Sequence, residues 1–526
     1  MADSFLSSAK LISALTFTSR CFGLIRDIIC LRFFGTAVWH YFALPFIIPN
    51  LFRRLFGEGA LAAALIPVYT EKLKQDPNGA KLLARSVVTI LISTLTVLTL
   101  LGLTLIFLCL HFLTLNDKTI LTLQLAAVML PYLILICAVA AVGALLNVHR
   151  HFAAPAAAPI LLNLVIIAVV LFFRDLFGTD PFQQIYGVAF AVLIAGFLQL
   201  AIHLPPLHRA GLSIKPAFAF GDPHFKKFLK LMLPMMLGLS VVQFNVLLDS
   251  VIAFSLSASD QSGDTFQFLG RAVAYPLKEG SLSYLYLAQR LYQLPLAVFG
   301  IALATAVFPL LTRYAVANDR ESYSRTLAHS LRLTLWIAIP ATVGLIIIAR
   351  PLIQLLFEQG FDSRFMPEDT TQTAWTLIGY TVGLIAYCLQ QIIIRAFYAF
   401  QDAKTPVKIA MGMVIVNLIL NLSLIWHFAT AGLALATALT ASGQVFILTL
   451  ILIKRKLLVL TQDLTATLTK TLIAATVMAV ACLLTRSWLT DAAPLIQVTL
   501  ILTAGLGTFL TACLILKNKI PLTPET

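Results

Sequence analysis

Four arginines placed within strongly apolar segments are the residues best suited to chemistry in this sequence: Arg20, Arg26, Arg53 and Arg290. An arginine inside a bilayer costs several kcal/mol unless it faces a cavity or a partner. A guanidinium group stays charged and binds two oxygens at once, which suits phosphate and diphosphate groups. Together the four residues predict a cationic pocket for an anionic headgroup.

The first two arginines are six residues apart, with Asp27 directly after Arg26. Six residues of helix turn through about 600°, so Arg20 and Arg26 do not share a narrow stripe, but both could line one wide cavity. Asp27 is expected to pair with Arg20 or with the second helix. The alternative is that these arginines lie near an interface and extend their charges into water.

The second arginine segment contains a proline-induced break. Pro49 interrupts the helical hydrogen-bond ladder, and Asn50 can satisfy the freed backbone groups. Arg54 and Glu58 are four residues apart and could pair, which leaves Arg53 for a ligand. The alternative is an interfacial basic turn.

A second set of polar residues could hold a cation. Asp249 is the only acid deep in an apolar segment of the second half, Asn417 and Asn421 share one helical face, and Thr437 lies in the next segment. Their carboxylate, amide and hydroxyl oxygens are suitable ligands for a hard cation. The alternative is ordinary hydrogen bonding between helices.

The composition identifies the elements that must position these residues. The chain has 526 residues, of which 60% are hydrophobic and only 11% charged. This excludes a soluble enzyme, a secreted disulfide scaffold and a disordered chain, and predicts an all-α polytopic membrane protein. About 14 transmembrane helices are expected, over roughly 9–34, 39–56, 80–113, 119–147, 155–174, 183–204, 226–257, 282–314, 324–348, 371–400, 405–427, 430–453, 464–488 and 494–516.

The distribution of Lys and Arg predicts the orientation. With the N-terminus inside, the inside segments hold 22 of these residues and the outside segments hold 7. The positive-inside rule therefore places both termini in the cytoplasm. The longest outside loop, roughly 258–281, is polar and shows no chemical motif.

A faint internal repeat suggests two halves. Residues 60–70, ALAAALIPVYT, and 302–312, ALATAVFPLLT, are identical at six of eleven positions. Repeated halves are the common plan of transporters, with the site at their interface. We expect an N-lobe of six helices at 1–215, a C-lobe of six helices at 216–456 and two further helices at 457–526.

Several stretches resemble the lipid II flippases of peptidoglycan synthesis, the MurJ (MviN) family of the multidrug/oligosaccharidyl-lipid/polysaccharide exporter superfamily. They are SRCFGLIRD, FFG, IPNLFRRLFGEGA, QRLYQLPLAVFGIALATAVFPLLTR and FYAFQDAKTPVKIA. The resemblance covers nearly the whole chain. It implies fourteen helices in two lobes around a central cleft, in the bacterial cytoplasmic (inner) membrane.

The implied activity is transport by alternating access, with no bond change. The implied cargo is lipid II, an undecaprenyl-diphosphate-linked disaccharide peptide, carried from the inner to the outer leaflet. The other expected partners are membrane lipids and the peptidoglycan synthesis machinery; no nucleic acid and no cofactor are expected. The last two helices would form a groove for the lipid tail.

The resemblance also implies roles for individual residues. The headgroup would be bound by Arg20, Arg26, Arg53, Arg290 and Asn50. Supporting or gating roles would fall on Asp27, Arg54, Glu58 and Gln289. A sodium-type site would consist of Asp249, Asn417, Asn421, Thr437 and the carbonyl of Leu433.

Three positions depart from the family pattern. His40, Gln289 and Asn421 stand where the family usually has acids. The first two changes leave the cleft more positive, and the third weakens cation binding. Sodium and the membrane potential are therefore alternative driving forces.

Three other activities are alternatives for a chain of this composition. A flippase for another polyprenyl-diphosphate-linked oligosaccharide needs the same arginines, whereas a multidrug exporter would favour a more acidic or apolar cleft. A membrane glycosyltransferase would need a catalytic carboxylate near the outer face. The outside acids, for example Asp260, Asp362 and Glu368, follow no recognisable spacing.

Overall fold

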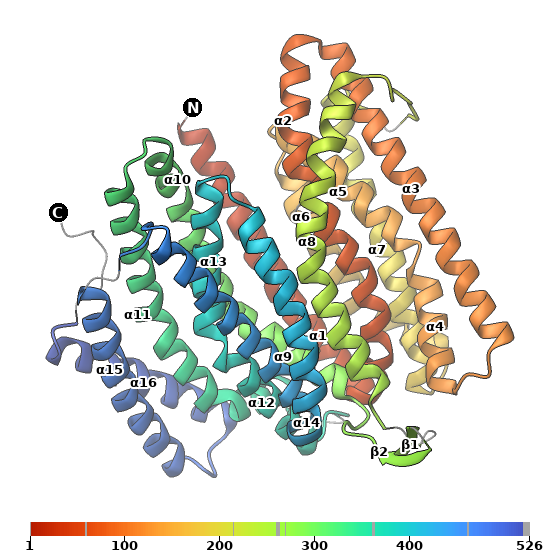
Figure 1. Cartoon of the computed structure of the whole chain (residues 1–526). Helices are drawn as coiled ribbons and strands as arrows, with labels where there is room; N and C mark the ends of the chain where they lie inside the picture. The colour runs from red at the N-terminus through yellow and green to blue at the C-terminus, as the bar shows by residue number, and fades with distance from the viewer. Residues whose placement is uncertain are drawn as a thin grey trace. The chain divides into compact units, whose positions relative to one another are not determined.

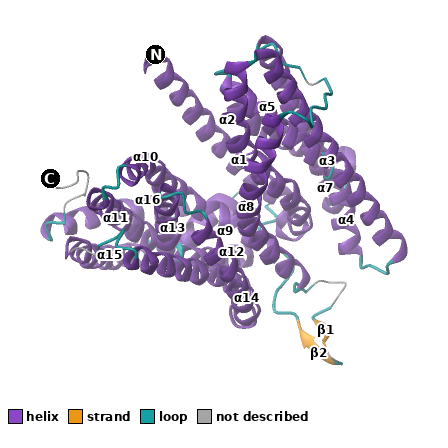
Figure 2. Cartoon of the chain, turned by 45° about the horizontal axis from the view of Figure 1, so that its top comes forward, coloured by secondary structure: helices purple, strands orange, loops and turns teal. Residues whose placement is uncertain are grey.

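The computed structural model describes residues 2–57, 60–213, 215–258, 263–268, 270–359, 363–459 and 462–518, and these residues are almost entirely helical (Figures 1 and 2). Within this described part, nine helices are long and apolar enough to cross a membrane, or ten if one bent pair forms a single span. Many large apolar side chains on these helices are exposed, as in helices that face lipid. The predicted all-α polytopic fold is confirmed.

The first compact unit, unit 1, contains Met1–Phe254 and Ser259–Val273. Its elements are α1 (Ala2–Phe52), η1 (Arg53–Gly57), α2 (Ala60–Gln75), α3 (Pro77–Phe112), α4 (Asp117–Met129), α5 (Tyr132–Val148), α6 (Ala153–Ala168), η2 (Val169–Phe173), η3 (Arg174–Phe177), α7 (Pro181–Arg209), α8 (Pro223–Ser255), β1 (Thr265–Phe268) and β2 (Arg271–Ala274). Helix α1 packs against α4, α6 and α7, and η1 packs against α1, α2 and α5. The loop predicted at 258–281 contains the two short strands.

The second compact unit, unit 2, contains Ser255–Ala258 and Ala274–Thr526. Its elements are α9 (Ser281–Pro295), η4 (Leu296–Ile301), α10 (Ala302–Val316), α11 (Arg320–Ile353), η5 (Gln354–Glu358), α12 (Pro367–Val382), α13 (Leu384–Ala399), α14 (Lys404–Lys454), α15 (Gln462–Trp488) and α16 (Pro494–Ile515). Helix α11 is its centre, because it packs against α10, α12, α13, α15 and α16. The packing therefore groups α8 with unit 1, whereas the sequence repeat assigned this segment to the second lobe. The predicted lobe boundaries at 215 and 456 describe the repeat and stay predictions.

Two long helices are hairpins with a turn of a single residue. Helix α1 breaks at Gly35 (φ 68°, ψ −179°), a conformation that essentially only glycine adopts without strain. The Arg26 guanidinium lies 5.9 Å from the centre of the Phe46 ring, so the segments before and after Gly35 run side by side in opposite directions. Each half matches one predicted span, 9–34 and 39–56.

Helix α14 repeats this arrangement in unit 2, where it breaks at Ala429 (φ 49°, ψ −131°). An added Cβ on Gly432 would lie 2.4 Å from the Leu424 carbonyl oxygen, and one on Gly443 would lie 3.6 Å from the Met413 sulfur. Residues before and after the break therefore approach one another both near Ala429 and farther from it, so the two halves of α14 are antiparallel. The halves correspond to the predicted spans 405–427 and 430–453.

Two predicted spans are divided in the structure. The segment 119–147 forms α4 and α5, which are separated at Leu130 and Pro131. The segment 371–400 forms α12 and α13, which meet at Gly383 with a bend of 40°. Every other predicted span coincides with helical structure to within a few residues.

The two blocks of the internal repeat have the same local structure. Each block begins an α-helix, α2 or α10, and each helix contains a proline, Pro67 or Pro309. Each also follows a π-helix, η1 or η4. A π-helix is rare, and it often occurs at functional sites. The shared form supports the repeat that the residue identities suggested.

Candidate functional site

Arg26 is buried and held by two residues from two helices. Its Nε and Nη2 donate to Asp27 Oδ1 at 3.0 and 2.6 Å, and its Nη1 donates to Asn163 Oδ1 of α6 at 3.0 Å. Arg26 is 3% exposed and Asp27 1% exposed. Asn163 Nδ2 in turn donates to the Ser19 carbonyl at 3.1 Å. The charge of Arg26 is therefore neutralised locally, and its position is fixed.

The Asn163 contact depends on close packing of α1 and α6. An added Cβ on Gly23 would lie 3.6 Å from Asn163 Nδ2, so glycine leaves room for the amide. The pairing of Asp27 with its sequence neighbour Arg26 was not predicted from the sequence; the expected pairing of Asp27 with Arg20 or the second helix stays a prediction.

Arg20 has the opposite environment. It is exposed, and no hydrogen bond or ion pair to it occurs in the described part of the chain. It lies six residues before Arg26 on the same helix, about 9 Å along the axis. Arg20 is thus a cation available to an anion, whereas Arg26 is already paired.

The residues after the Pro49 break position the third arginine. Asn50 Nδ2 donates to the Phe46 carbonyl at 2.9 Å, which agrees with its predicted role in satisfying backbone groups. Arg53 Nε donates to Asn50 Oδ1 through a long bond of 3.5 Å. Arg53 begins the π-helix η1 and is half-buried. Asn50 therefore has two roles: it satisfies a backbone carbonyl and it orients the Arg53 side chain.

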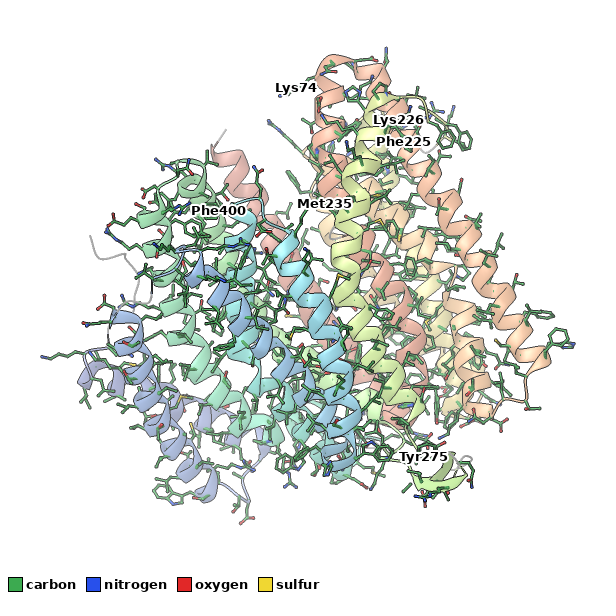
Figure 3. The ribbon with its side chains drawn as sticks, viewed as in Figure 1. Lys74, Phe225, Lys226, Met235, Tyr275 and Phe400 are labelled. Carbon is green, nitrogen blue, oxygen red and sulfur yellow. The ribbon has the colours of Figure 1, made fainter. Side chains whose placement is uncertain are left out.

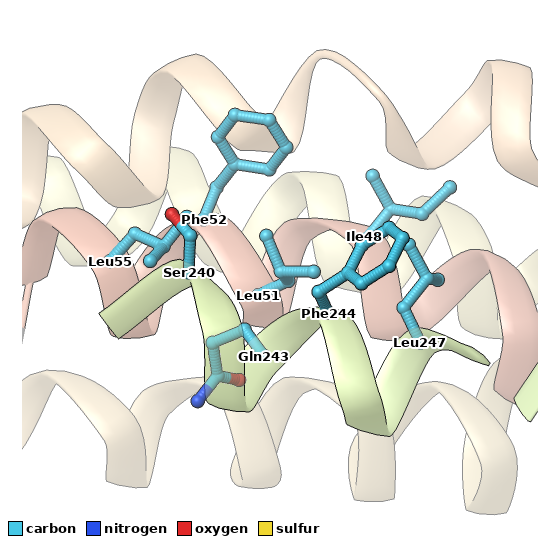
Figure 4. A pocket seen from close by; sticks show the side chains of 8 residues that line it. All are labelled: Ile48, Leu51, Phe52, Leu55, Ser240, Gln243, Phe244 and Leu247. Atoms are coloured by element: carbon cyan, nitrogen blue, oxygen red, sulfur yellow. The ribbon is translucent and has the colours of Figure 1, made fainter. Parts of the chain in front are cut away.

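Arg54 has a hydrogen-bond partner on α8, and its predicted pair with Glu58 stays a prediction. Its Nη1 donates to Gln243 Oε1 of α8 at 3.4 Å. Glu58, the predicted partner, lies outside the described residues. Gln243 also lines an apolar cavity of about 240 Å³ between α1 and α8, within unit 1 (Figure 4). The other lining residues are Ile48, Leu51, Phe52, Leu55, Ser240, Phe244 and Leu247.

A buried polar chain in unit 1 was not anticipated from sequence. Tyr132 Oη of α5 donates to Gln199 Oε1 of α7 at 3.2 Å, and Gln199 Nε2 donates to the Ala158 carbonyl at 2.8 Å. Tyr132 lies within electrostatic range of Arg53 and Arg26. A single Tyr or Gln in an apolar helix gives no sequence signal that separates such a chain from ordinary helix packing.

His40 occupies the position where an acid was expected. It is 2% exposed, and its ring stacks on Phe254 at 5.3 Å and meets Tyr41 edge-on at 5.3 Å. Aromatic packing therefore accommodates the histidine in unit 1.

The fourth arginine lies in unit 2 on an aromatic support. Arg290 is exposed, its guanidinium lies 5.0 Å from the Tyr286 ring centre, and Nη2 donates to Tyr286 Oη at 2.8 Å. Gln289 Nε2 donates to Tyr380 Oη of α12 at 2.9 Å, and Tyr292 stacks on Tyr380 at 5.0 Å. The tyrosines fix the turn of α9 that presents Arg290. Because Arg290 and the other three arginines belong to different units, their predicted assembly into one pocket stays a prediction.

The predicted sodium ligands are also divided between the units. Asp249 is buried in α8 of unit 1. In unit 2, Asn421 Nδ2 donates to Asn417 Oδ1 at 2.9 Å, and the Thr437 hydroxyl donates to the Leu433 carbonyl at 3.2 Å. The four predicted ligands of unit 2 thus all lie on α14, two on each side of its break. All four would offer neutral oxygens to a cation. No cluster of three or more His, Cys, Asp and Glu side chains with metal-binding geometry occurs among the described residues.

These features define a class of protein, a polytopic helical transporter with cations inside its membrane segments. The fold alone is shared with an inward-facing multidrug resistance transporter of the MATE family, of the MOP superfamily. That structure is 14% identical, covers 85% of this chain and 98% of its own, and gives a TM-score of 0.65.

A family model described as lipid II flippase MurJ matches residues 30–503, and the chain belongs to this family. A probable lipid II flippase MurJ of Vibrio cholerae is 32% identical over 450 residues, covering 83% of this chain and 80% of its own length. Lipid II flippase MurJ of Burkholderia cenocepacia is 30% identical over 455 residues, with 84% and 83% covered. A solved lipid II flippase MurJ, in an inward closed conformation, gives a TM-score of 0.74 at 26% identity, covering 96% and 98%.

The family and the apolar helices together make this chain a multi-pass inner-membrane protein of a transporter family.

Proposed function

We propose that this protein moves lipid II from the inner to the outer leaflet of the cytoplasmic membrane by alternating access. The observation that carries the proposal is membership of the lipid II flippase family across residues 30–503. The arginines inside the membrane segments, of which Arg20 and Arg290 are exposed and Arg26 is paired with Asp27, suit a cargo that carries a diphosphate. We further propose that no bond is made or broken, so the protein is not an enzyme.

Three of the arginines are suited to direct contact with the diphosphate and sugars. Arg20 and Arg290 are exposed, and Arg53 is half-buried and oriented by Asn50. Arg26 joins this group only when its pair with Asp27 opens. We assign supporting or gating roles to Asp27, Arg54, Glu58 and Gln289.

The orientation follows from the basic residues. Lys74 and Lys226 lie at one end of unit 1 (Figure 3), which supports a common cytoplasmic side for the segments that contain them. We infer from the positive-inside rule that both termini are cytoplasmic. The peptidoglycan synthesis machinery is the proposed protein partner, and the last two helices are proposed to hold the lipid tail.

The driving force is sodium or the membrane potential. The membrane potential is favoured because only Asp249 among the predicted ligands carries a charge, and the number of charged ligands tunes the affinity of a hard cation. The oxygens of Asn417, Asn421, Leu433 and Thr437 are neutral. In vesicles containing the purified protein, replacing Na⁺ by K⁺ should leave lipid II movement unchanged, and collapsing the potential should stop it. Loss of movement on removing Na⁺ alone would instead require the sodium site.

Depletion of the protein in cells provides the main test. Lipid II should accumulate, and a reagent restricted to the outer leaflet should reach much less of it. Normal labelling in a strain without a second flippase would refute the proposal. Accumulation of a different polyprenyl-diphosphate-linked oligosaccharide would identify the alternative cargo.

The site is tested by substitution. Arg290→Ala and Arg53→Ala should abolish growth support while the protein still inserts in the membrane. Arg320→Ala, at an exposed position at the start of α11, is the matched control and should behave as wild type. Full activity of Arg290→Ala would remove that residue from the site.

A further inference from the structure

The loop between α7 and α8 is fastened to the side of α3. Arg85 Nε and Nη2 donate to the carbonyls of Lys215 and Pro216 at 2.9 and 3.1 Å. The Ala217 amide donates to Thr89 Oγ1 of α3 at 3.1 Å. Three hydrogen bonds over consecutive residues hold this part of the loop in one conformation.

The attachment points lie well inside α3. Arg85 and Thr89 are eight and twelve residues after Pro77, where the helix begins, which corresponds to about 12–18 Å along its axis. The apolar run of α3 begins at Val87, between these two residues. The loop therefore returns to the level at which the apolar part of the helix starts, which is where the lipid headgroups lie.

Two phenylalanines project from this fastened loop. Phe218 is 64% exposed and Phe220 57% exposed, with their rings stacked at 5.9 Å. Phe220 also meets the buried Phe225 of α8 edge-on at 6.0 Å, so the pair is anchored to the unit. Exposed phenylalanines at this depth are suited to insertion at the boundary between lipid headgroups and acyl chains.

The charged residues around the two rings leave a positive surface. Lys215, Lys226 and Lys230 are exposed, and no hydrogen bond or ion pair from their ammonium groups occurs in the described part of the chain. The nearby acids are already paired: Asp222 lies 3.6 Å from Lys72, and Glu71 lies 2.6 Å from Lys227. Figure 3 shows Lys226 beside Phe225 at this end of unit 1.

We propose that Lys215, Phe218, Phe220, Lys226 and Lys230 form a binding surface for acidic phospholipids of the bilayer. The two rings insert at the interface, and the lysines bind the phosphate groups. A cytoplasmic protein is the less suitable occupant, because the loop is held at the level of the headgroups rather than beyond them. The surface shares no residue with the set of membrane arginines and uses the bulk lipid, not the transported one.

Ring depth is tested with the full-length protein in phosphatidylcholine nanodiscs containing 20% phosphatidylglycerol. Phe220→Trp adds one emitter to the five native tryptophans, and its contribution is obtained by difference from wild type. Lipids brominated near the headgroup end of the chain should quench the added emission. Gln75→Trp, at the exposed end of α2, is the control and should not be quenched. Should Phe220→Trp and Phe218→Trp both resist quenching, the rings are outside the membrane and the proposal is wrong.

Charge preference is tested by the number of phosphatidylglycerol molecules retained in mixed micelles, measured by native mass spectrometry. One lysine near an acidic surface contributes a factor of about five in binding. Lys215→Gln with Lys226→Gln should therefore lower the preference for phosphatidylglycerol over phosphatidylcholine by about 25-fold. The control, Lys215→Arg with Lys226→Arg, should retain it. An unchanged preference in the glutamine variant would overturn the proposal even if the rings are quenched.

Discussion

The buried pair of Arg26 and Asp27 permits a quantitative test that separates structure from transport. Asp27→Leu removes the acceptor of two hydrogen bonds, at 3.0 and 2.6 Å, and leaves a guanidinium that is 3% exposed without its carboxylate. Breaking a buried ion pair in this way costs about 3–5 kcal/mol. For a domain of this size, about 2 °C per kcal/mol applies, so the unfolding temperature should fall by about 6–10 °C.

The double variant gives the decisive comparison. R26M/D27L replaces both charges by apolar groups of similar size, and such replacements are often neutral or stabilising. We expect its unfolding temperature to lie near that of wild type, so that the coupling between the two sites is about 3 kcal/mol or more. Thermal unfolding of the detergent-solubilised protein, followed by size-exclusion chromatography, is measured for Asp27→Leu, Arg26→Met and the double variant.

The exposed pair of Arg325 and Glu321 is the matched control. Its atoms are 2.8 Å apart, but the side chains are 57% and 82% exposed. Such a pair contributes at most about 1 kcal/mol, so the corresponding cycle should show little coupling. Equal coupling in both cycles, or a D27L variant as stable as wild type, would refute the reasoning from burial. If the stable R26M/D27L variant still supports growth, Arg26 serves the structure and not transport.

Three further outcomes are expected from the backbone and from one surface carboxylate. Gly35→Ala should lower stability by about 1–3 kcal/mol, because the turn at φ 68° disfavours a Cβ; an unchanged unfolding temperature would mean the hairpin turn relaxes easily. Ala429→Gly should raise stability by about 1 kcal/mol, as relief of strain at φ 49° exceeds the entropic cost of glycine, and a fall would contradict this. Partial burial raises the pKa of Asp402, but hydrogen bonds from Thr405 and Arg455 outweigh it and lower that pKa to about 2. The ionised Asp402 therefore stabilises the fold fully above about pH 4, and this stabilisation disappears as the pH falls through 2. The unfolding temperature of Asp402→Asn should lie below that of wild type by a constant amount from about pH 5 to 7, and the difference should shrink between about pH 4 and 2.

The spans were predictable from sequence because apolar length is dictated by the bilayer. The two hairpins were found in this way, with boundaries at Gly35 and Ala429, since a short break between two apolar runs is visible in the residues. The bend at Gly383 was not, because glycine is common inside transmembrane helices and marks no boundary there. The π-helices were missed for a similar reason, as one extra residue per turn changes no residue type.

The candidate cations were also predictable, because a charge in an apolar run stands out. Their partners were not. Asn163 is 137 residues away from Arg26, and only the packing of α1 against α6 brings the two together. The same holds for Gln243 and Arg54, which come from α8 and η1. Sequence spacing predicted the local pair of Arg54 with Glu58, which stays a prediction, but it could not predict the contact of Arg54 with Gln243, because that contact joins distant segments.

The single-residue turn at Gly35 also restricts how the sidedness of this protein can be measured. An epitope or protease site inserted there would have to open a buried turn, so the insertion would unfold the hairpin instead of reporting its location. The connection at 113–116, between α3 and α4, offers exposed backbone on the same predicted side of the membrane. A cleavable tag at 113–116 should be cut by a protease on the outer side of the cytoplasmic membrane, which makes this short connection the place to determine the orientation of the whole chain.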